Sequence, residues 1–253
     1  MSIAPRKDLG QHFLVDDNIL RVIGRLAELA PDDVVLEVGP GLGVLTRFLA
    51  ARVAHVHAVE VDRRLEEHLS GLDRTSLHWG DALALDVRAL TPPPRKLVAN
   101  LPYNVATPIV AESLAVEQLD LWCVMVQREV ADRFFALPST KAYGAVSVLV
   151  QLTSVRSGFH AVSREVFRPR PKVDSALVAL RRTSPAPSAA VRRVVEGAFG
   201  HRRKTLANAL ALAGVAPRER AVEALASIGR GATVRAEALE PAEFVSLAQA
   251  LGG

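Results

Sequence analysis

The sequence has few of the residues that hold small secreted or metal-stapled domains together. Its 253 residues include a single cysteine, Cys123, which excludes an intrachain disulfide. The cysteine and the seven histidines do not have zinc-ligand spacing. Apolar runs stay shorter than the roughly 20 residues that a membrane-spanning helix needs, and residues 1–10 lack the apolar segment of a secretory signal. We therefore expect no metal, no membrane association and a cytoplasmic location.

Charge is unevenly distributed along the chain, although the net charge is only +4. Residues 1–180 carry 20 Lys and Arg against 21 Asp and Glu, whereas residues 181–253 carry 11 against 6. A local excess of positive charge favours a polyanionic partner such as a nucleic acid. An ordinary solvated helical surface would give the same excess, so charge alone leaves both interpretations open.

The first part of the chain alternates short apolar runs with helical patterns. This alternation is typical of an α/β domain with a doubly wound sheet, in which ligands bind at the carboxyl ends of the strands. Helices are expected at Leu42–Ala51, at Arg63–Leu69 and from about Pro108. The expected strands are Val34–Val38, His55–Val59, Ser76–Trp79, Leu97–Asn100, Leu121–Val126 and Ser175–Arg181.

A second domain is expected after a short segment rich in proline and serine. Residues 184–188 read Ser-Pro-Ala-Pro-Ser, which is typical of a linker. Four helical patterns and no strand follow it, so we expect a domain of residues 1–183, a linker at 184–188 and an all-helical basic domain at 189–253. The four helices are predicted at Ala189–Phe199, Arg203–Leu212, Pro217–Ile228 and Pro241–Leu251.

A glycine turn follows the first long strand, in the segment Glu37–Gly43. Glycine lets a backbone turn tightly and approach a ligand closely, so the turn indicates a nucleotide-like cofactor. The dinucleotide fingerprint fails because Val44 stands at its last position. Pro40 also lacks the N–H that a phosphate-binding loop would donate. The alternative interpretation is that Gly39, Gly41 and Gly43 serve only turning and packing.

Two acidic residues follow the next two strands. Glu60 can accept both hydroxyls of a ribose, and Asp81 can accept from an adenine amino group. A glycine turn, a glutamate and an aspartate at three strand ends, without a phosphate-binding device, suit S-adenosylmethionine as the cofactor.

The segment Asn100-Leu101-Pro102-Tyr103 follows the fourth strand, at the same expected edge. An aromatic amine is a poor nucleophile because its lone pair is delocalised. Carbonyl oxygens of Asn100 and Leu101 could accept its hydrogens, with Pro102 stiffening the loop and Tyr103 stacking on the base. Catalysis would then rest mainly on positioning. The alternative is a strand-ending turn with a buried tyrosine.

Taken in order, these motifs resemble the KsgA-type small-subunit rRNA adenine dimethyltransferases and, more broadly, the rRNA adenine-N6 methyltransferase family. The resemblance runs from Lys7 to the C-terminus. It rests on Leu9–Leu14, Glu37–Gly43, Asn100–Pro108, Gln127–Val130, Lys141–Gly144, Phe167–Ser175 and Phe199–Leu206.

The resemblance implies a Rossmann-like, S-adenosylmethionine-dependent methyltransferase domain and a role for each matching residue. It places Tyr103 and Phe167 on either side of a flipped adenine. His12 departs from the pattern, because the family often has asparagine there. The implied cofactor-binding residues are Gln11, His12, Leu14, Gly39, Gly41, Glu60, Asp81, Ala82 and Asn100, and the implied catalytic residues are Asn100, Leu101, Pro102, Tyr103 and Phe167.

Two basic segments are candidates for RNA binding. Arg168, Arg170 and Lys172 lie in a proline-stiffened loop beside Phe167, an arrangement that favours stacking and phosphate contacts. Arg202–Lys204 is a cluster of three cations at the start of a predicted helix, suited to phosphates. A solvated loop and an ordinary charged helix face are the respective alternatives.

The KsgA-type resemblance implies N6-dimethylation of two adjacent adenines in a hairpin near the 3′ end of small-subunit rRNA. The implied partners are ribosomal RNA and an assembling small subunit, and we expect a monomer. One alternative is the related large-subunit rRNA methyltransferase of macrolide-type resistance. The other is a ribosome-assembly or transcription factor that keeps the fold without catalysis.

Overall fold

The computed structural model describes Arg6 and residues 11–252. The Leu9–Gly10 part of the first motif, and Lys7, lie outside the described residues. The chain forms two compact units. The first contains the chain up to Ala131 together with Val155–Thr183, and the second contains Asp132–Ser154 together with the chain from Ser184 onwards.

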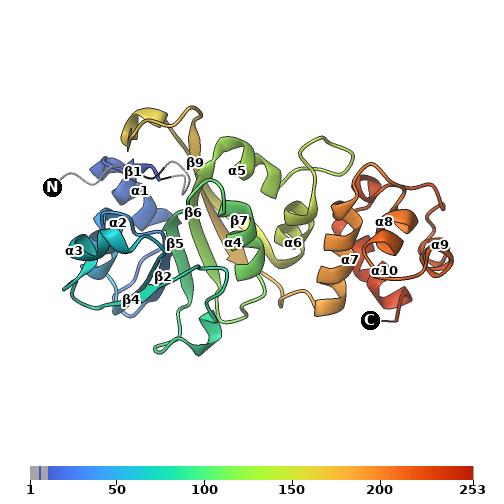
Figure 1. The fold of residues 1–253 in the computed structure, drawn as a ribbon, viewed down its shortest axis with the longest axis horizontal. Helices are drawn as coiled ribbons and strands as arrows, with labels where there is room; N and C mark the ends of the chain where they lie inside the picture. Colours follow the sequence, from blue (N-terminus) through green and yellow to red (C-terminus); the bar gives the residue numbers. More distant parts are fainter. Residues whose placement is uncertain (1–5, 7–10, 253) are drawn as a thin grey trace. The chain divides into compact units, whose positions relative to one another are not determined.

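The first unit is built around a seven-stranded sheet in the order β4-β3-β2-β5-β6-β9-β7, which Figure 1 shows as arrows. Each strand expected from the sequence is present with ends within one residue of the prediction, which confirms the α/β class. The strands are β2 (Val34–Val38), β3 (His55–Glu60), β4 (Thr75–Trp79), β5 (Lys96–Asn100), β6 (Leu121–Gln127), β7 (Ser154–Val162) and β9 (Ser175–Arg182).

The strand order creates a crevice between β2 and β5. From β4 through β6 all neighbouring strands are parallel, and β9 pairs with β6 in the antiparallel direction. The chain runs outward from β2 to β3 and β4, then returns to β5 on the other side of β2. Ligands of such sheets bind at this reversal, at the carboxyl ends of the strands.

Helices cover both faces of the sheet because its central strands are apolar on both sides. Helices α1 (Asp17–Leu26) and α2 (Val44–Ala50) share a core with Cys123 and Met125 of β6. On the opposite face, Trp122 donates from Nε1 to the Ser113 hydroxyl of α4 (Ala106–Ser113) at 2.9 Å. The sequence separation of two between Cys123 and Met125 is the strand periodicity that points them to the same face.

The N-terminal elements were not expected from the sequence. Strand β1 (Phe13–Leu14) pairs antiparallel with β8 (Phe167–Arg168) in a separate two-stranded sheet. Asp16 begins α1 as its N-cap, because its carboxylate accepts from the backbone N–H groups of Asn18 and Ile19. The pairing of β1 with β8 holds the segment from 11 to 15 against the chain that precedes β9.

The second unit is helical, but it includes a segment that the sequence analysis assigned to the first domain. The Tyr143 hydroxyl donates to the Leu239 carbonyl at 2.8 Å, and the ring of Phe199 lies 5.8 Å from those of Tyr143 and Phe244. These contacts group the 132–154 segment with the C-terminal helices. The helices that lie wholly in this unit are α6 (Ala145–Thr153), α7 (Ala189–Gly200), α8 (Leu206–Leu212), α9 (Arg218–Ser227) and α10 (Pro241–Ala250), and α5 (Arg128–Phe134) joins the two units.

One prediction about this unit is wrong. The Arg202–Lys204 cluster does not lie on a helix but in the turn between α7 and α8. The Lys204 N–H bonds to the His201 carbonyl to form that turn, and Thr205, with extended backbone, is the N-cap residue that begins α8. The helical pattern of the sequence predicted that this helix begins at Arg203, whereas α8 begins at Leu206.

Candidate functional site

A pocket lies in the first unit at the carboxyl ends of β2, β3, β4 and β5. It brings together residues that are far apart in the sequence, as expected for the crevice of such a sheet. Of the residues predicted for the site, those that line the pocket are Gln11, His12, Leu14, Gly39, Gly41, Glu60, Asp81, Ala82, Asn100, Leu101, Pro102 and Tyr103.

The glycine turn needs glycine for both conformation and space. Gly39 has φ +73° and Gly41 has φ +58°, in the left-handed region that L side chains rarely adopt. A Cβ on Gly39 would lie 3.2 Å from the ring of Pro102, and one on Gly41 would lie 3.0 Å from the ring of Phe13. The turn therefore packs directly against the Asn-Leu-Pro-Tyr loop and the N-terminal segment.

Glu60 ends β3 with a carboxylate held by backbone N–H groups. Its Oε1 accepts from Val61 and Asp62, each at 2.9 Å, and its Oε2 accepts from Gly41 at 3.2 Å. Burial raises the pKa of Glu60, and these three bonds act in the opposite direction. The carboxylate is thus fixed in orientation at the pocket wall, and Oε2 can accept a further hydrogen bond.

Glu37 is a pocket residue to which the sequence analysis gave no role. It is 1% exposed and lines the pocket from the end of β2. Burial, with a further contribution from the charge of Glu60, raises the pKa of Glu37 to about 8. Among the described residues, its Oε2 and the Thr46 hydroxyl are the buried side-chain polar atoms without a hydrogen-bond partner. A glutamate inside a buried apolar strand was the sequence signal for this group.

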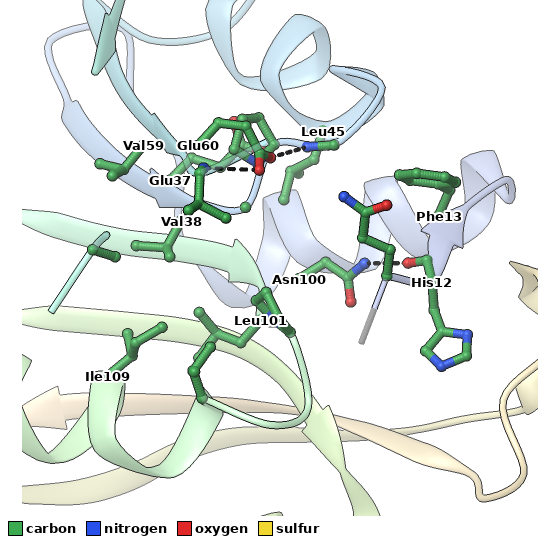
Figure 2. A pocket seen from close by; sticks show the side chains of 18 of the residues that line it. His12, Phe13, Glu37, Val38, Leu45, Val59, Glu60, Asn100, Leu101 and Ile109 are labelled. Carbon is green, nitrogen blue, oxygen red and sulfur yellow. Dashed lines mark hydrogen bonds between the residues drawn. The ribbon is translucent and has the colours of Figure 1, made fainter. Parts of the chain in front are cut away.

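The N-terminal segment is tied to the Asn-Leu-Pro-Tyr loop through His12. Figure 2 shows the amide of Asn100 joined to the backbone carbonyl of His12, at 3.0 Å from Nδ2. The His12 ring donates from Nδ1 to the Pro169 carbonyl at 2.8 Å. Gln11 donates to Asp62 at 3.1 Å, and ion pairing with Arg64 lowers the pKa of Asp62 to about 2. These bonds hold residues 11 and 12 at the pocket.

The Asn-Leu-Pro-Tyr loop is anchored at both ends. The Leu101 N–H donates to Met125 at 3.1 Å, and the Pro102 carbonyl accepts from Val105 at the start of α4. The Tyr103 hydroxyl lies 2.5 Å from the Ser175 hydroxyl, and its ring lies 5.2 Å from that of His12. Asn100 Oδ1 and the Leu101 carbonyl oxygen are the acceptors that this arrangement leaves for an amine.

Two other predicted site residues have contrasting surroundings. Asp81 is exposed, and its Oδ1 accepts from the Leu83 N–H at 2.9 Å, which shapes the turn after β4. Phe167 is 0% exposed and packs in the core with Leu14 and Val162. Its ring does not face the pocket in this structure, so its stacking role stays a prediction that requires the ring to move.

The candidate RNA-binding residues lie in both units and differ in their partners. Arg170 forms an ion pair with Glu165 at 2.6 Å, and Arg168 donates to the carbonyls of residues 165 and 167. In the second unit Arg202 pairs with Glu237 at 3.1 Å, whereas Arg203 and Lys204 are exposed. Lys172 is also exposed.

Within Arg6 and residues 11–252, none of the helices is long and apolar enough to cross a membrane. The same residues hold no group of three or more His, Cys, Asp and Glu side chains placed to bind a metal ion.

Comparison with known proteins gives consistent matches over nearly the whole chain. A family model described as ribosomal RNA adenine dimethylase matches residues 4–251. The ribosomal RNA small subunit methyltransferase A of Rubrobacter xylanophilus is 48% identical over 96% of this chain and 94% of its own length. The protein of the same name from Moorella thermoacetica is 43% identical over 98% of this chain and 93% of its own.

Solved structures agree in fold. A dimethyladenosine transferase from Plasmodium falciparum superposes with a TM-score of 0.70 over 93% of this chain and 96% of its own, at 22% identity. The 23S rRNA methyltransferase ErmE superposes with a TM-score of 0.61 at 31% identity, over 95% of this chain and 100% of its own. The Rossmann-like fold expected from the sequence is therefore confirmed.

Proposed function

This chain belongs to the ribosomal RNA adenine dimethylase family, and from that premise we propose that it dimethylates adenine N6 in small-subunit rRNA with S-adenosylmethionine as the methyl donor. The enzyme class and the cofactor are those expected from the sequence. The proposed target is the pair of adjacent adenines in a hairpin near the 3′ end. The observation that carries the proposal is the fixed amide of Asn100 beside the glycine turn.

The pocket residues fit S-adenosylmethionine. A Cβ at Gly39 or Gly41 would fill the space along the turn, and the carboxylates of Glu60 and Asp81 follow the next two strands. The partnerless Oε2 of buried Glu37 is a further hydrogen-bonding atom at this end of the pocket. When bound, the cofactor supplies an electrophilic methyl group on a sulfonium. Gln11, His12, Leu14 and Ala82 would complete its surroundings.

Asn100 and Leu101 would activate the target amine by accepting its hydrogens. The Asn100 Nδ2 atom is committed to the His12 carbonyl, so the Oδ1 atom is oriented as an acceptor. With the Leu101 carbonyl it would draw the amine hydrogens to one side and expose the nitrogen lone pair. Pro102 fixes this backbone, and Tyr103 offers a ring for stacking. Such positioning can supply roughly 7–11 kcal/mol in favourable cases.

The substrate is ribosomal RNA, and its finer context is part of the proposal. We place an assembling small subunit as the natural substrate, a monomer as the active form and the cytoplasm as its location. The helical domain of residues 189–253 would bind RNA through Arg202, Arg203 and Lys204, and the loop of Arg168, Arg170 and Lys172 would contact the target strand. The target base must leave its stack, which costs a few kcal/mol.

The two alternatives are not favoured. Small-subunit methyltransferases match at 40–48% identity, whereas the large-subunit enzyme ErmE matches at 31%. A non-catalytic factor would have no need of the acceptors at Asn100 and Glu60, which the chain keeps in place by hydrogen bonds to His12 and Gly41.

Mass mapping of RNA tests the function directly. The purified protein and S-adenosylmethionine are incubated with unmethylated small subunits and, separately, with protein-free large-subunit rRNA. We expect dimethyladenine at two adjacent positions near the 3′ end of the small-subunit RNA. Modification confined to the large-subunit RNA would transfer the protein to the resistance branch, and no modification of either RNA would support a non-catalytic factor.

A further inference from the structure

The hydroxyl of Tyr103 forms a hydrogen bond with a residue far away in the sequence. Its partner, Ser175, is the first residue of β9, and their oxygen atoms are 2.5 Å apart. In the sheet, β6 lies between β5, whose loop carries Tyr103, and β9. The bond therefore spans the end of β6 and joins the catalytic loop to a strand that is not its neighbour.

Ser175 is itself a fixed point. It is 1% exposed, and its backbone is in register with Gln127 in the β6–β9 ladder. The preceding residue, Asp174, accepts from the Arg128 N–H at 3.0 Å and forms an ion pair with Arg164 at 2.8 Å. The strand therefore fixes the Cα and Cβ atoms of Ser175 and leaves its Oγ a choice among three staggered positions, one of which meets Tyr103.

The ring of Tyr103 is not held in place by burial alone. It is only partly buried, and burial raises its pKa, so the phenol is neutral at physiological pH. The ring of His12 lies 5.2 Å away at an interplanar angle of 33°, and the hydroxyl is fixed by Ser175. Phe167, the other aromatic residue expected to stack on the base, is buried in the core. Tyr103 is therefore the predicted stacking residue that already lines the pocket.

We propose that Ser175 is a positioning residue, which holds the hydroxyl end of Tyr103 and so fixes the direction of its ring, so that the target adenine stacks with its amine directed at Asn100 and Leu101. This inference rests on the proposed function. Ser175 does not touch the base or the cofactor in this role. It acts through the hydroxyl–hydroxyl bond, and without that bond the ring can swing about the Cα–Cβ bond away from the position that stacking requires.

A double-mutant cycle tests this role. Ser175→Ala, Tyr103→Phe and the double variant are compared with the wild type in single-turnover methylation of unmethylated small subunits at saturating S-adenosylmethionine. Because each single variant removes the same bond, we expect each to slow methyl transfer about tenfold, and the double variant to be no slower than either. The dissociation constant for S-adenosylmethionine, measured by calorimetry, should stay within about twofold.

Ser113→Ala is the matched control. Ser113 is also a buried serine whose hydroxyl bonds to an aromatic side chain, accepting from Trp122, but it lies on α4 and does not line the pocket. We expect a loss of thermal stability similar to that of Ser175→Ala with a wild-type rate of methylation. If both serine variants slow methylation in proportion to their loss of stability, Ser175 has only a structural role.

The remaining outcomes separate this inference from the proposed function. Wild-type rates in Ser175→Ala, or additive losses in the double variant, would overturn the positioning role while the wild-type protein still methylates small subunits. Absence of methylation by the wild type would overturn the function itself. If Ser175→Ala does not fold, Tyr103→Phe removes the same bond from the loop, and a wild-type rate in that variant would overturn the inference.

Discussion

The polar groups in the pocket of the first unit are fixed by hydrogen bonds, whereas two of the cations in the basic turn of the second unit are exposed to solvent. In the pocket, Glu60 accepts three backbone N–H groups and the amide of Asn100 is bound to His12. In the turn, Arg203 and Lys204 are exposed to solvent. Chemistry on an amine requires acceptors fixed before the substrate arrives, whereas attraction to phosphates tolerates mobile charges. Substitutions in the two regions should therefore fail in different ways.

Asn100→Ala should have the largest effect. It removes the Oδ1 acceptor and the bond to the His12 carbonyl, so we expect methylation to fall by roughly a hundredfold or more. Binding to unmethylated small subunits, measured by sedimentation, should stay near the wild-type value because the basic segments are untouched. Asn18→Ala, at an exposed position of α1 that does not line the pocket, is the control and should keep most activity. Wild-type turnover in Asn100→Ala would contradict the role of this amide.

Gly39→Ala should have the next largest effect on methylation. Gly71→Ala is its control, because it carries the same backbone strain without a neighbouring side chain. Both glycines have φ +73°, so both substitutions carry a backbone strain of about 1–3 kcal/mol. A Cβ at Gly39 meets the Pro102 ring at 3.2 Å, whereas nothing lies within 4 Å of one at Gly71. We expect both variants to lose thermal stability but only Gly39→Ala to lose S-adenosylmethionine binding and methylation. Equal losses of binding would show that strain alone, without the Pro102 contact, explains the effect.

The parts of the molecule that local sequence determines were predictable. Apolar strand runs and the glycine turn placed β2 to β6 within one residue, and parallel topology then placed Glu60, Asp81 and Asn100 at one edge. Contacts over long sequence distances were not predictable in this way. Ser175 lies 72 residues from Tyr103, and the pairing of β1 with β8 joins segments more than 150 residues apart.

Local patterns carry less information where burial or helix termination decides the outcome. Phe167 stands next to three cations, yet its ring is in the core because β8 pairs with β1 and turns it inward. The cations at 202–204 continue a helical pattern, yet the turn between α7 and α8 interrupts it. Glu37 looks like part of a buried strand, and only the structure shows that its carboxyl group lines the pocket.

Glu37→Gln should change how stability depends on pH. In the folded protein the pKa of Glu37 is raised to about 8 from 4.5. Between these pH values the folded state holds the proton more tightly than the unfolded state. The stabilisation that the protonated Glu37 gives the folded state is therefore fully present below pH 4.5 and is lost as pH rises towards 8. Glutamine does not titrate. In urea unfolding, the free energy of unfolding of the variant should rise relative to that of the wild type between pH 5 and pH 8, by on the order of 1–4 kcal/mol.

The exposed Glu67 on α3 (Glu66–Leu69) provides the control for this comparison. The stability curve of Glu67→Gln should run parallel to that of the wild type over the same range, because this substitution leaves the buried carboxyl of Glu37 in place. If the Glu37→Gln and wild-type curves are also parallel, the Glu37 carboxyl is ionised in the folded protein and the pocket stabilises its charge.

The smallest effect is expected in the basic turn. Arg202 is tied to Glu237 and to the Thr140 carbonyl, so its removal would mix stability with binding. Arg203→Ala with Lys204→Ala avoids this problem. If both side chains contact phosphates, the slope of log affinity against log salt should decrease in magnitude by roughly 1.4–1.8. Thermal stability and the rate of methylation at saturating subunits should stay near the wild-type values.

The control for the basic turn must remove the same charge from the same unit. Arg218 and Arg220 on α9 lie within 4.0 Å of Glu219 and Glu223, respectively. Replacing both by alanine lowers the net charge by two, so a nonspecific effect of charge would flatten the salt dependence equally in both pairs. A flattened slope for Arg203 and Lys204 alone would assign phosphate contacts to the turn. An unchanged slope would leave the turn as solvated surface, and RNA affinity would then have to come from the loop of Arg168, Arg170 and Lys172.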